Sequence, residues 1–392
     1  MAEQVNSRPD LSQLRVLEFD SGVAGAFATA MLADHGADTI ICEGPSGSPL
    51  RTLGPEPVQD VWWATLARNK RSLAIDATRP DSEVILERLK ASASVVVDGA
   101  VNDRAESDGA MGLHVYPTGA DDPNLWGWGT APELAGAATG MMAITGWAAG
   151  PPVQPEFPLA DYTTGMMGAA STLLELRASH LEMRRPIDLS LATHETMLRM
   201  NEWQLGVASA MGKPEFRVGN RLPMNTNVGS IFETGDGKLL TVSAATQAVI
   251  MRLIAMVGGE EAAKDLRFQT IVDRKENMDA LEEIIAAWML RHDADDAMRQ
   301  VQAHDVVAGP IFDAEDLKNS RQLAARGAIT HLDTAGGDSV AMPAVLPALP
   351  GLSVRPRWSG CQVGEHTDEI LAALGFTAAE IDAFRRSGAV WK

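Results

Sequence analysis

The stretch that decides the fold is Leu14–Cys42, which reads LRVLEFDSGVAGAFATAMLADHGADTIIC. The apolar runs Leu14–Phe19 and Asp38–Cys42 are typical of short buried strands, and Phe27–His35 between them has the apolar spacing of a helix. The glycines of Gly22–Gly25 predict a turn after the first strand. Because parallel strands need a crossover helix, this order predicts a βαβ unit.

The same order of elements repeats further along the chain. Ser72–Ile75 and Ser94–Val97 are strand-like, and Asp81–Ser92 between them has helical spacing. We therefore expect an α/β fold with a large Rossmann-like domain, in which helices cover both faces of a doubly wound sheet. The stretch 98–129 is rich in Gly, Asp and Asn and predicts little regular structure.

The second half of the chain predicts a smaller domain. The elements expected before it are a helix at 164–177, a strand at 185–191 and a long helix at 192–211. Near Gly219 the pattern changes to polar turns, and a hairpin-like pair of strands and three helices follow. These lie at 229–233, 238–242, 247–257, 278–291 and 294–304. We expect a small α+β domain at 219–326 and a large domain at 1–218, which residues 327–392 complete.

Length and charge narrow the classes of function. A chain of 392 residues is long enough for two domains. With 33 basic and 52 acidic residues the net charge is -19, which disfavours nucleic acid or an anionic membrane as a partner. A small anionic ligand remains compatible, because a few basic side chains or backbone N–H groups can hold a phosphate.

The cysteines and the termini give no sign of secretion or of a metal. Cys42 and Cys361 have no metal-type neighbours and are expected to be buried small side chains. The first residues are polar, and no run of about 18 apolar residues occurs, so we expect a cytoplasmic protein without a membrane span.

Asp161 lies in Pro158–Gly165 (PLADYTTG), directly ahead of a helical run. The dipole and the free N–H groups of a helix N-terminus stabilise a carboxylate there. On this pattern alone an N-cap aspartate is the favoured interpretation, and a nucleophile is the alternative. A carboxylate so placed would stay ionised, which suits a nucleophile better than a proton donor.

Two other motifs are candidate phosphate sites. The turn at Gly22–Gly25 lacks the third glycine of the dinucleotide fingerprint, so a plain βα turn is favoured over a nicotinamide site. The basic run Arg68–Arg71 (RNKR) either holds ligand phosphates or forms ion pairs, and composition does not decide between these.

The histidines point to neither a metal site nor a serine hydrolase. None of them forms a pair at metal spacing, and the sequence has no serine nucleophile elbow. His194 is expected to pack on a helix and His366 to cap one.

Short segments along the whole chain carry a family likeness through their order and spacing. They are LRVLE (14–18), AGAFAT (24–29), LADHGAD (32–38), RNKRS (68–72), TG (145–146), PLADY (158–162), GNR (219–221), GP (309–310) and GEHTDEIL (364–371). In this order they resemble the class III CoA-transferase family (CaiB/BaiF type), which includes formyl-CoA transferase and the 2-methylacyl-CoA racemases.

The resemblance implies an interlocked homodimer, with a heteromer as the alternative, that acts on an acyl-CoA and a carboxylic acid. Coenzyme A is then a substrate and not a resident cofactor. The family nucleophile is the aspartate of the L-A-D segment, here Asp161. In the implied mechanism Asp161 attacks the donor thioester to give an anhydride, and the CoA thiolate returns to form an aspartyl-CoA thioester. An acceptor carboxylate then attacks, and a second anhydride passes its acyl group to CoA.

The resemblance also implies which residues contact coenzyme A. By position they are Val23, Ala24, Gly44, Ile75, Asp76, Ala77, Thr78, Gly99, Ala100, Val101, Trp128, Gly129, Thr130 and Ala131. Arg71 of the basic run is added to them as a candidate contact of the CoA phosphates. Formyl-CoA transferase has glutamine in place of Val23, arginine in place of Gly44 and tryptophan near Leu53. We therefore expect a bulkier and less polar acyl group than formyl or oxalyl.

Two alternatives remain within the family. The racemases pair the aspartate with a histidine, and Ala131 stands where that histidine would be. A site with one base cannot deliver a proton to the opposite face, so racemisation is the weaker hypothesis. A non-catalytic subunit of a heteromer is the other alternative, and the presence of Asp161 argues against it.

Overall fold

The chain folds into two compact units. The computed structural model describes residues 11–56, 58–99, 109–117, 131–154, 157–212, 217–221, 228–334, 337–348 and 355–391. The first unit comprises Met1–Met141, Pro155–Glu202 and Arg321–Lys392, and the second comprises Met142–Gln154 and Trp203–Ser320.

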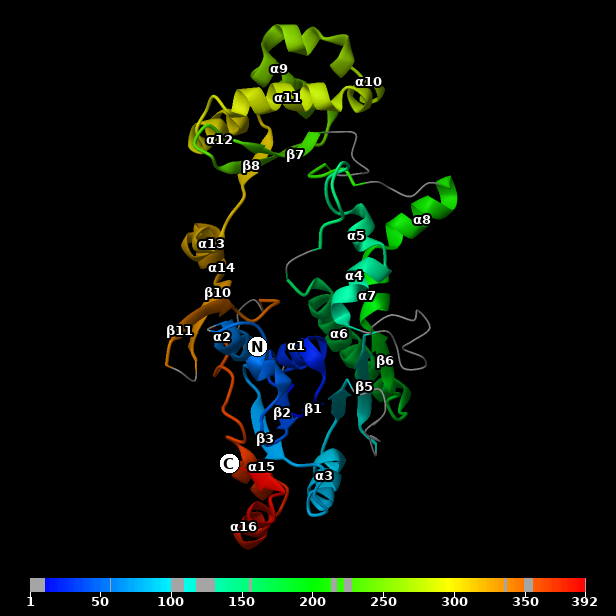
Figure 1. Ribbon diagram of the computed structural model, residues 1–392, viewed down its shortest axis with the longest axis vertical. Coiled ribbons are helices and arrows are strands. Elements are labelled where there is room, and N and C mark those ends of the chain that lie inside the picture. Colours follow the sequence, from blue (N-terminus) through cyan, green and yellow to red (C-terminus); the bar gives the residue numbers. More distant parts are fainter. Residues whose placement is uncertain are drawn as a thin grey trace, which may run out of the picture. The chain divides into compact units, whose positions relative to one another are not determined.

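A sheet of seven strands forms the centre of the described part of the first unit (Figure 1). Its order is β12-β3-β2-β1-β4-β5-β6, and only β12, which pairs with β3, runs antiparallel. The strands are β1 (Arg15–Phe19), β2 (Asp38–Glu43), β3 (Arg71–Ile75), β4 (Val95–Asp98), β5 (Met111–Tyr116), β6 (Leu189–Ala192) and β12 (Val390–Trp391). The prediction of an α/β fold around a parallel sheet is confirmed.

The strand order reverses between β1 and β4. β1 pairs with β2 on one side and with β4 on the other, so the two halves of the sheet diverge from this point. In open α/β sheets, ligands bind beyond the carboxyl ends of the strands at such a reversal. Here the segments that begin at Asp20 and Gly99 leave the sheet.

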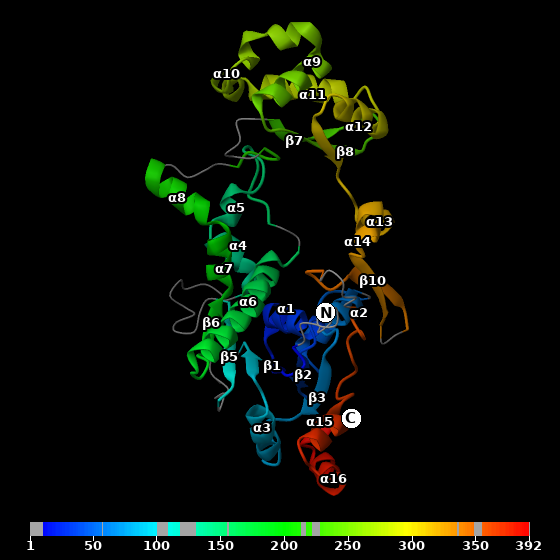
Figure 2. The same ribbon diagram turned by 180° about the vertical axis from the view of Figure 1, so that it is seen from behind.

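Helices cover both faces of this sheet. Successive strand residues point to opposite sides and therefore pack into two separate cores. Val16 and Val97 pack in the core that α1 (Gly22–Asp34) and α6 (Leu159–Glu182) share. Leu17 and Val96 face the other core, with α3 (Ser82–Ala91), α15 (Thr367–Ala373) and α16 (Ala378–Ser387). Figures 1 and 2 show α1 and α6 side by side.

Two predictions for this unit are wrong, each for a packing reason. α1 begins at Gly22, so Gly22 and Gly25 belong to the helix and not to a turn ahead of it. A Cβ at Gly25 would lie 2.2 Å from the Cβ of Ser21, so the glycine makes room for that side chain. The stretch 98–129 contains β5, a fully buried strand. Gly112 interrupts the apolar pattern of this strand in the sequence. The fold needs the glycine, because an added Cβ would lie 2.6 Å from Nε2 of His114.

The long helix predicted at 192–211 is two helices. α7 (Thr193–Met200) ends at Asn201, and α8 (Glu202–Met211) begins after it. Asn201 is buried, and its side-chain amide donates a hydrogen bond to the carbonyl oxygen of Thr139 at 3.1 Å. The contact units divide at the same place, after Glu202.

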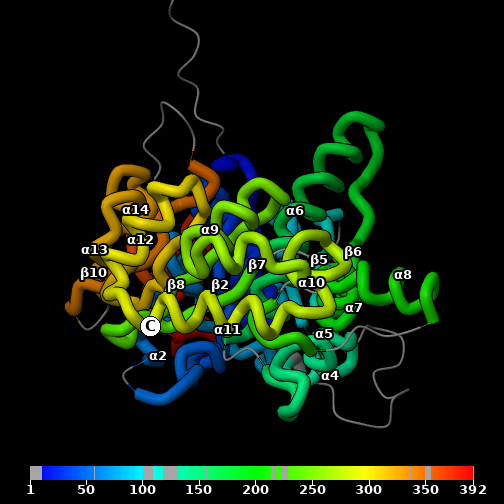
Figure 3. Tube along the Cα trace, turned by 90° about the horizontal axis from the view of Figure 1, so that it is seen from above, coloured from blue at the N-terminus to red at the C-terminus, as the bar shows by residue number. Residues whose placement is uncertain are grey.

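The second unit places helices against a small antiparallel sheet. The predicted hairpin is confirmed as β7 (Val228–Glu233) and β8 (Leu239–Ala244), and β9 (Val307–Pro310) pairs with β8. The helices are α9 (Gln247–Lys264), α10 (Ile271–Glu276), α11 (Met278–Met289) and α12 (Ala294–Ala303). Seen from above, α9 and α11 lie over β7 and β8 (Figure 3).

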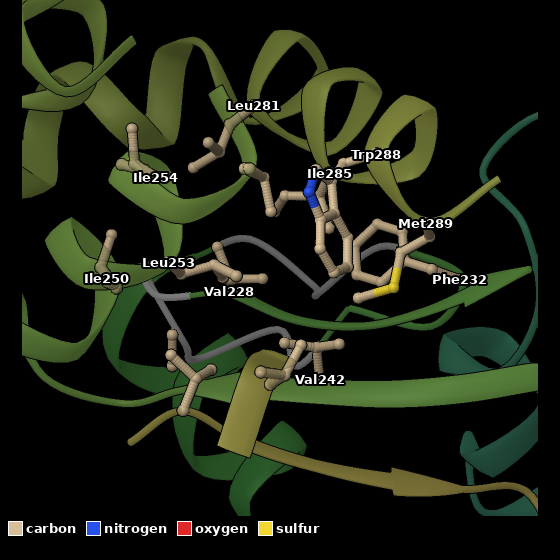
Figure 4. Packing of buried hydrophobic residues seen from close by; sticks show 14 of the residues in the cluster. Val228, Phe232, Val242, Ile250, Leu253, Ile254, Leu281, Ile285, Trp288 and Met289 are labelled. Atoms are coloured by element: carbon tan, nitrogen blue, oxygen red, sulfur yellow. The ribbon is translucent and has the colours of Figure 1, made fainter. Parts of the chain in front are cut away.

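This second unit has a core of its own. Phe232 and Val242 from the strands meet Ile254, Ile285 and Trp288 from the helices (Figure 4). Their burial gives the unit an apolar centre independent of the larger sheet.

The other described elements are short. They are η1 (Pro49–Thr52), α2 (Val58–Leu66), η2 (Pro132–Leu134), α4 (Ala135–Ala138), α5 (Met141–Ile144), η3 (Leu266–Phe268), α13 (Ala314–Asn319), α14 (Arg321–Arg326), β10 (Ile329–Asp333) and β11 (Ser339–Pro343). Across the described ranges, no helix is both long and apolar enough to cross a membrane.

Candidate active site

α6 carries Asp161 in its first turn. The helix begins at Leu159 and Pro158 is its N-cap, so Asp161 is the third helical residue. The interpretation of Asp161 as an N-cap is therefore wrong. The hydroxyl of Thr164 donates to the carbonyl oxygen of Ala160 at 2.7 Å and so satisfies a backbone acceptor of the same turn.

Glycines let α6 approach α1 and the sheet. A Cβ at Gly165 would lie 2.6 Å from the carbonyl oxygen of Ala24, so no larger residue fits without a shift. One turn on, a Cβ at Gly168 would lie 3.2 Å from Cδ2 of Leu113. This close packing fixes Asp161 beside the start of α1.

A cavity of about 360 Å³ lies at the carboxyl edge of the sheet, where the strand order reverses. The residues that line it are Asp20, Ser21, Gly22, Val23, Ala24, Leu50, Leu53, Gly99, Val115, Tyr116, Pro117, Glu133, Asp161 and Thr193. Most of them follow β1 or β4, end or follow β5, or begin α1 and α7. Leu50 and Leu53 come from η1 and its C-cap, Glu133 comes from η2, and α6 adds Asp161. The cavity thus occupies the place where a doubly wound sheet binds its ligand.

The electrostatic setting of Asp161 differs from the sequence expectation. Burial, together with the negative charge of Glu133, raises the pKa of Asp161 to about 6, against an ordinary 3.8. The expected effect of a helix N-terminus has the opposite sign and is outweighed. The carboxylate remains mostly ionised above pH 7, at a higher free energy than an exposed aspartate, which favours attack on a carbonyl carbon.

Three of the residues predicted to contact coenzyme A come together with Asp161. Val23, Ala24 and Gly99 all line the cavity, as does Leu53, the position compared with a tryptophan. Ala131 lies two residues before Glu133, on the exposed surface. Ala100, Val101 and residues 128–130 lie outside the described part of the chain.

A second predicted group lies further along the same edge of the sheet. Ile75 ends β3, and Ala77 and Thr78 line a shallow pocket of about 600 Å³ with Arg79 and Lys90. Asp76 directly precedes Ala77 in the chain. It accepts hydrogen bonds from the hydroxyl and the backbone N–H of Thr78, and both bonds lower the pKa of Asp76. Gly44, directly after β2, is partly exposed and has open space where a side chain would stand.

The basic run Arg68–Arg71 serves internal ion pairs. Arg68 binds Asp34, and Arg71 binds Asp38 and Glu369. Lys70 is fully buried and donates to Glu18 at 2.8 Å. Since Arg71 opens β3, it lies at the amino edge of the sheet, and the structure does not bring it to the cavity.

Histidine is absent from the cavity lining within the described ranges. His194 lies on α7, with Nδ1 3.1 Å from the carbonyl oxygen of Pro117. His366 occupies the N-cap position of α15, but its side chain makes no capping bond. Instead its Nδ1 accepts a hydrogen bond from the backbone N–H of Ser72 at 3.3 Å.

Sequence reasoning missed five polar residues of the cavity. They are Asp20, Ser21, Tyr116, Glu133 and Thr193, and none of them was singled out as a candidate. A signal existed for Ser21, a serine directly before a helix that starts at the carboxyl end of a strand. Tyr116 ends β5, a strand that the sequence pattern does not predict, so the pattern does not place it at the site either.

The model of CoA-transferase family III matches residues 11–367, nearly the whole chain. The chain belongs to CoA-transferase family III. The family resemblance drawn from the sequence is thus confirmed, and the enzyme class is CoA-transferase.

Named relatives and solved structures agree with the family assignment. The succinyl-CoA–D-citramalate CoA-transferase of Chloroflexus aurantiacus is 29% identical, over 97% of this chain and 98% of its own. The succinate–glutarate CoA-transferase of Agrobacterium fabrum is 28% identical, over 95% and 98%. A CAIB/BAIF family protein from Brucella suis has the same fold, with a TM-score of 0.81 and 23% identity over 94% of this chain and 100% of its own.

Proposed function

We propose that this CoA-transferase moves coenzyme A from an acyl-CoA donor to a carboxylic acid with Asp161 as the nucleophile. The observation that carries the proposal is the place of Asp161, in a cavity that also contains the first turn of α1. Backbone N–H groups at a helix N-terminus stabilise the negative charge that develops on an attacked carbonyl oxygen.

The proposed reaction has two symmetric halves. The Asp161 carboxylate attacks the acyl carbon of the donor, the C–S bond breaks, and an anhydride and the CoA thiolate result. The thiolate attacks the aspartyl carbonyl of the anhydride, which releases the donor acid and leaves an Asp161–CoA thioester. The acceptor acid then repeats these steps in reverse order and leaves as its CoA thioester, so Asp161 is regenerated.

Coenzyme A is proposed to lie along the carboxyl edge of the sheet. Val23, Ala24 and Gly99 in the cavity support contact with its thiol end, and the pocket at Ala77 and Thr78 supports contact with its nucleotide end. Gly44, Ile75 and Asp76 stand along the same edge. Ala100, Val101, Trp128, Gly129, Thr130 and Ala131 remain proposed contacts on the family resemblance. Arg71 has no such support, because it lies at the opposite edge.

The relatives' names guide the choice of substrates and partners. They name succinyl-CoA or succinate together with citramalate or glutarate, so short carboxylic acids are the first acceptors to test. The interlocked homodimer stays a proposal. A relative named as the beta subunit of succinyl-CoA–L-malate CoA-transferase, 27% identical, supports the heteromer as its alternative.

Racemisation is the second candidate function and has less support. Its acid–base pair needs a histidine where Ala131 stands, and within the described ranges no histidine lines the cavity. A non-catalytic subunit has less support as well, because Asp161 is present in a formed cavity.

The test is a screen of acyl-CoA donors against carboxylic acids, followed by mass spectrometry, begun with succinyl-CoA and glutarate. Hydroxylamine added with the active donor should convert Asp161 to its hydroxamate, and Asp161→Asn should abolish transfer. An unmodified Asp161, or full transfer by the variant, excludes this mechanism. Exchange of an α-proton into deuterated solvent without any acceptor would favour racemisation.

A further inference from the structure

Ser21 stands at the N-cap position of α1 and does not cap the helix. Its backbone has φ -97° and ψ 7°, and its side chain accepts no hydrogen bond from the helix. The residue is 5% exposed, and its Oγ has no hydrogen-bond partner among the residues that the structure describes. A serine at an N-cap usually accepts a bond from an N–H of the first turn, and an unsatisfied buried hydroxyl destabilises a fold. Neither capping nor core hydrogen bonding accounts for this hydroxyl.

The same serine lines the active-site cavity at the positive end of a helix of 13 residues. Gly22, Val23 and Ala24 of the first turn line the cavity beside it. The N–H of Gly25 is the first to bond within the helix, to the carbonyl oxygen of Ser21 at 3.1 Å. The three N–H groups before it are therefore the helix's N-terminal donors, and no acidic side chain lies in this turn.

These donors suit an oxygen atom that carries negative charge. Asp20, Glu133 and Asp161 line the same cavity, and Asp20 directly precedes Ser21, so an entering carboxylate meets three carboxyl groups there. Hydroxyl and N–H donors at a helix N-terminus offset that repulsion, because they bind carboxylate oxygens directly. Among the described lining residues no side chain is basic.

We propose that the Ser21 hydroxyl and the first-turn N–H groups of α1 form the subsite that binds the carboxylate of the acceptor acid. This inference rests on the proposed function, because an acceptor carboxylate is needed only where the Asp161–CoA thioester forms. One carboxylate oxygen attacks the thioester carbonyl, a C–O bond forms, the C–S bond breaks, and the CoA thiolate leaves with the electron pair. Ser21 donates a hydrogen bond throughout, and no proton is transferred.

The test compares two nucleophiles on the same intermediate. Wild type and Ser21→Ala are converted to the Asp161–CoA thioester with succinyl-CoA, or with the best donor of the screen. Each is then offered glutarate, a carboxylate, or hydroxylamine, a neutral nucleophile that needs no anion subsite. We expect Ser21→Ala to slow the reaction with glutarate about tenfold or more, as loss of a hydrogen bond to a charged group does. The reaction with hydroxylamine should change less than twofold.

Two further variants separate this role from a structural one. Ser179 of α6 is also buried, and its hydroxyl donates to the carbonyl oxygen of Leu176 at 3.0 Å. Ser179→Ala removes this hydroxyl and should leave both rates unchanged. Ser21→Cys keeps the size of the side chain and a weaker donor, so its rate with glutarate should lie between those of wild type and Ser21→Ala.

The outcomes also separate this inference from the proposed function. If both rates stay unchanged in Ser21→Ala, or both fall by the same factor, the subsite is wrong while Asp161 keeps its role. If Asp161 in the wild type forms no thioester with any donor of the screen, the proposed function fails, and the subsite fails with it.

Discussion

Gly165 of α6 lies so close to Ala24 of α1 that a Cβ added to the glycine would come 2.6 Å from the carbonyl oxygen of Ala24. This contact joins the helix that carries Asp161 to the helix whose first turn lines the same cavity. Gly165→Ala must therefore push α6 away from α1. We expect a loss of about 1–3 kcal/mol in the free energy of unfolding, as for other overpacked sites, measured by urea denaturation. We also expect transfer activity to fall, because Asp161 moves with its helix.

Gly206→Ala is the matched control for that prediction. Gly206 also lies within a helix, α8, and a Cβ there would meet nothing within 4 Å. Alanine has the higher helix propensity, so this variant should be neutral or slightly more stable. Equal effects of the two substitutions would refute the role of close packing at Gly165.

The sequence predicts the first unit's βαβ order well, because buried parallel strands are short apolar runs separated by a helical pattern. It predicts β5 poorly, since Gly112 and His114 replace the β-branched residues that mark a strand. The bond from the Gly112 N–H to Oδ1 of Asp188 at 2.7 Å links residues far apart in the chain, and no local pattern contains it.

The residues of the candidate site also divide into those that the sequence predicts and those that it does not. The family likeness singles out Asp161, and the position of Val23 and Ala24 after β1 could be expected from the fold. Glu133 could not, because its effect on Asp161 depends on how η2 packs against α6. The charge of Arg71 makes it a candidate contact of coenzyme A. The sequence does not show that it pairs instead with Asp38 and Glu369, because these lie 33 and 298 residues away.

Asp161→Asn should stabilise the protein at neutral and alkaline pH. The pKa of Asp161 is about 6 in the folded chain against 3.8 as its ordinary value, so the ionised carboxylate destabilises the fold above pH 6. Since Asp161 is only half-buried, we expect a gain of about 1–2 kcal/mol at pH 8, less than the full shift would give. The gain should shrink as the pH falls and vanish below about pH 4.

Thermal unfolding at pH 8 and pH 4 measures this difference. Glu261→Gln, which removes an exposed carboxylate from α9, serves as the control and should show no gain at either pH. A loss of stability in Asp161→Asn at pH 8 would contradict the raised pKa.

The rate of Asp161–CoA thioester formation should fall in acid as Asp161 becomes protonated, with a midpoint near pH 6. Glu133→Gln removes the like charge that helps to raise the pKa of Asp161, so the midpoint should move to lower pH. Rapid-quench measurements with a single donor from pH 4.5 to 8 give the midpoint for each enzyme. An upward shift in Glu133→Gln would mean that Glu133 stabilises the ionised form of Asp161 instead.

Lys70 should be essential for the stability of the β1–α1 junction. It is fully buried and donates to Glu18 at 2.8 Å and to the carbonyl oxygen of Ala26 at 2.7 Å. Burial lowers the pKa of Lys70, while the neighbouring Glu18 opposes that shift. Lys70→Met leaves Glu18 buried without its cation, so we expect a loss of about 3–5 kcal/mol in the free energy of unfolding.

Two comparisons identify the buried charge as the cause. The double variant Glu18→Gln with Lys70→Met removes both charges and should recover a substantial part of the lost stability, because no unpaired ion remains. Lys264→Met breaks an exposed pair with Glu260 on α9 and should cost less than about 1 kcal/mol. If the double variant were less stable than Lys70→Met alone, the loss would come from missing hydrogen bonds to Ala26 and Thr29, and not from the unpaired carboxylate. Because Ala26 lies one turn from the cavity, transfer activity should follow stability through this series.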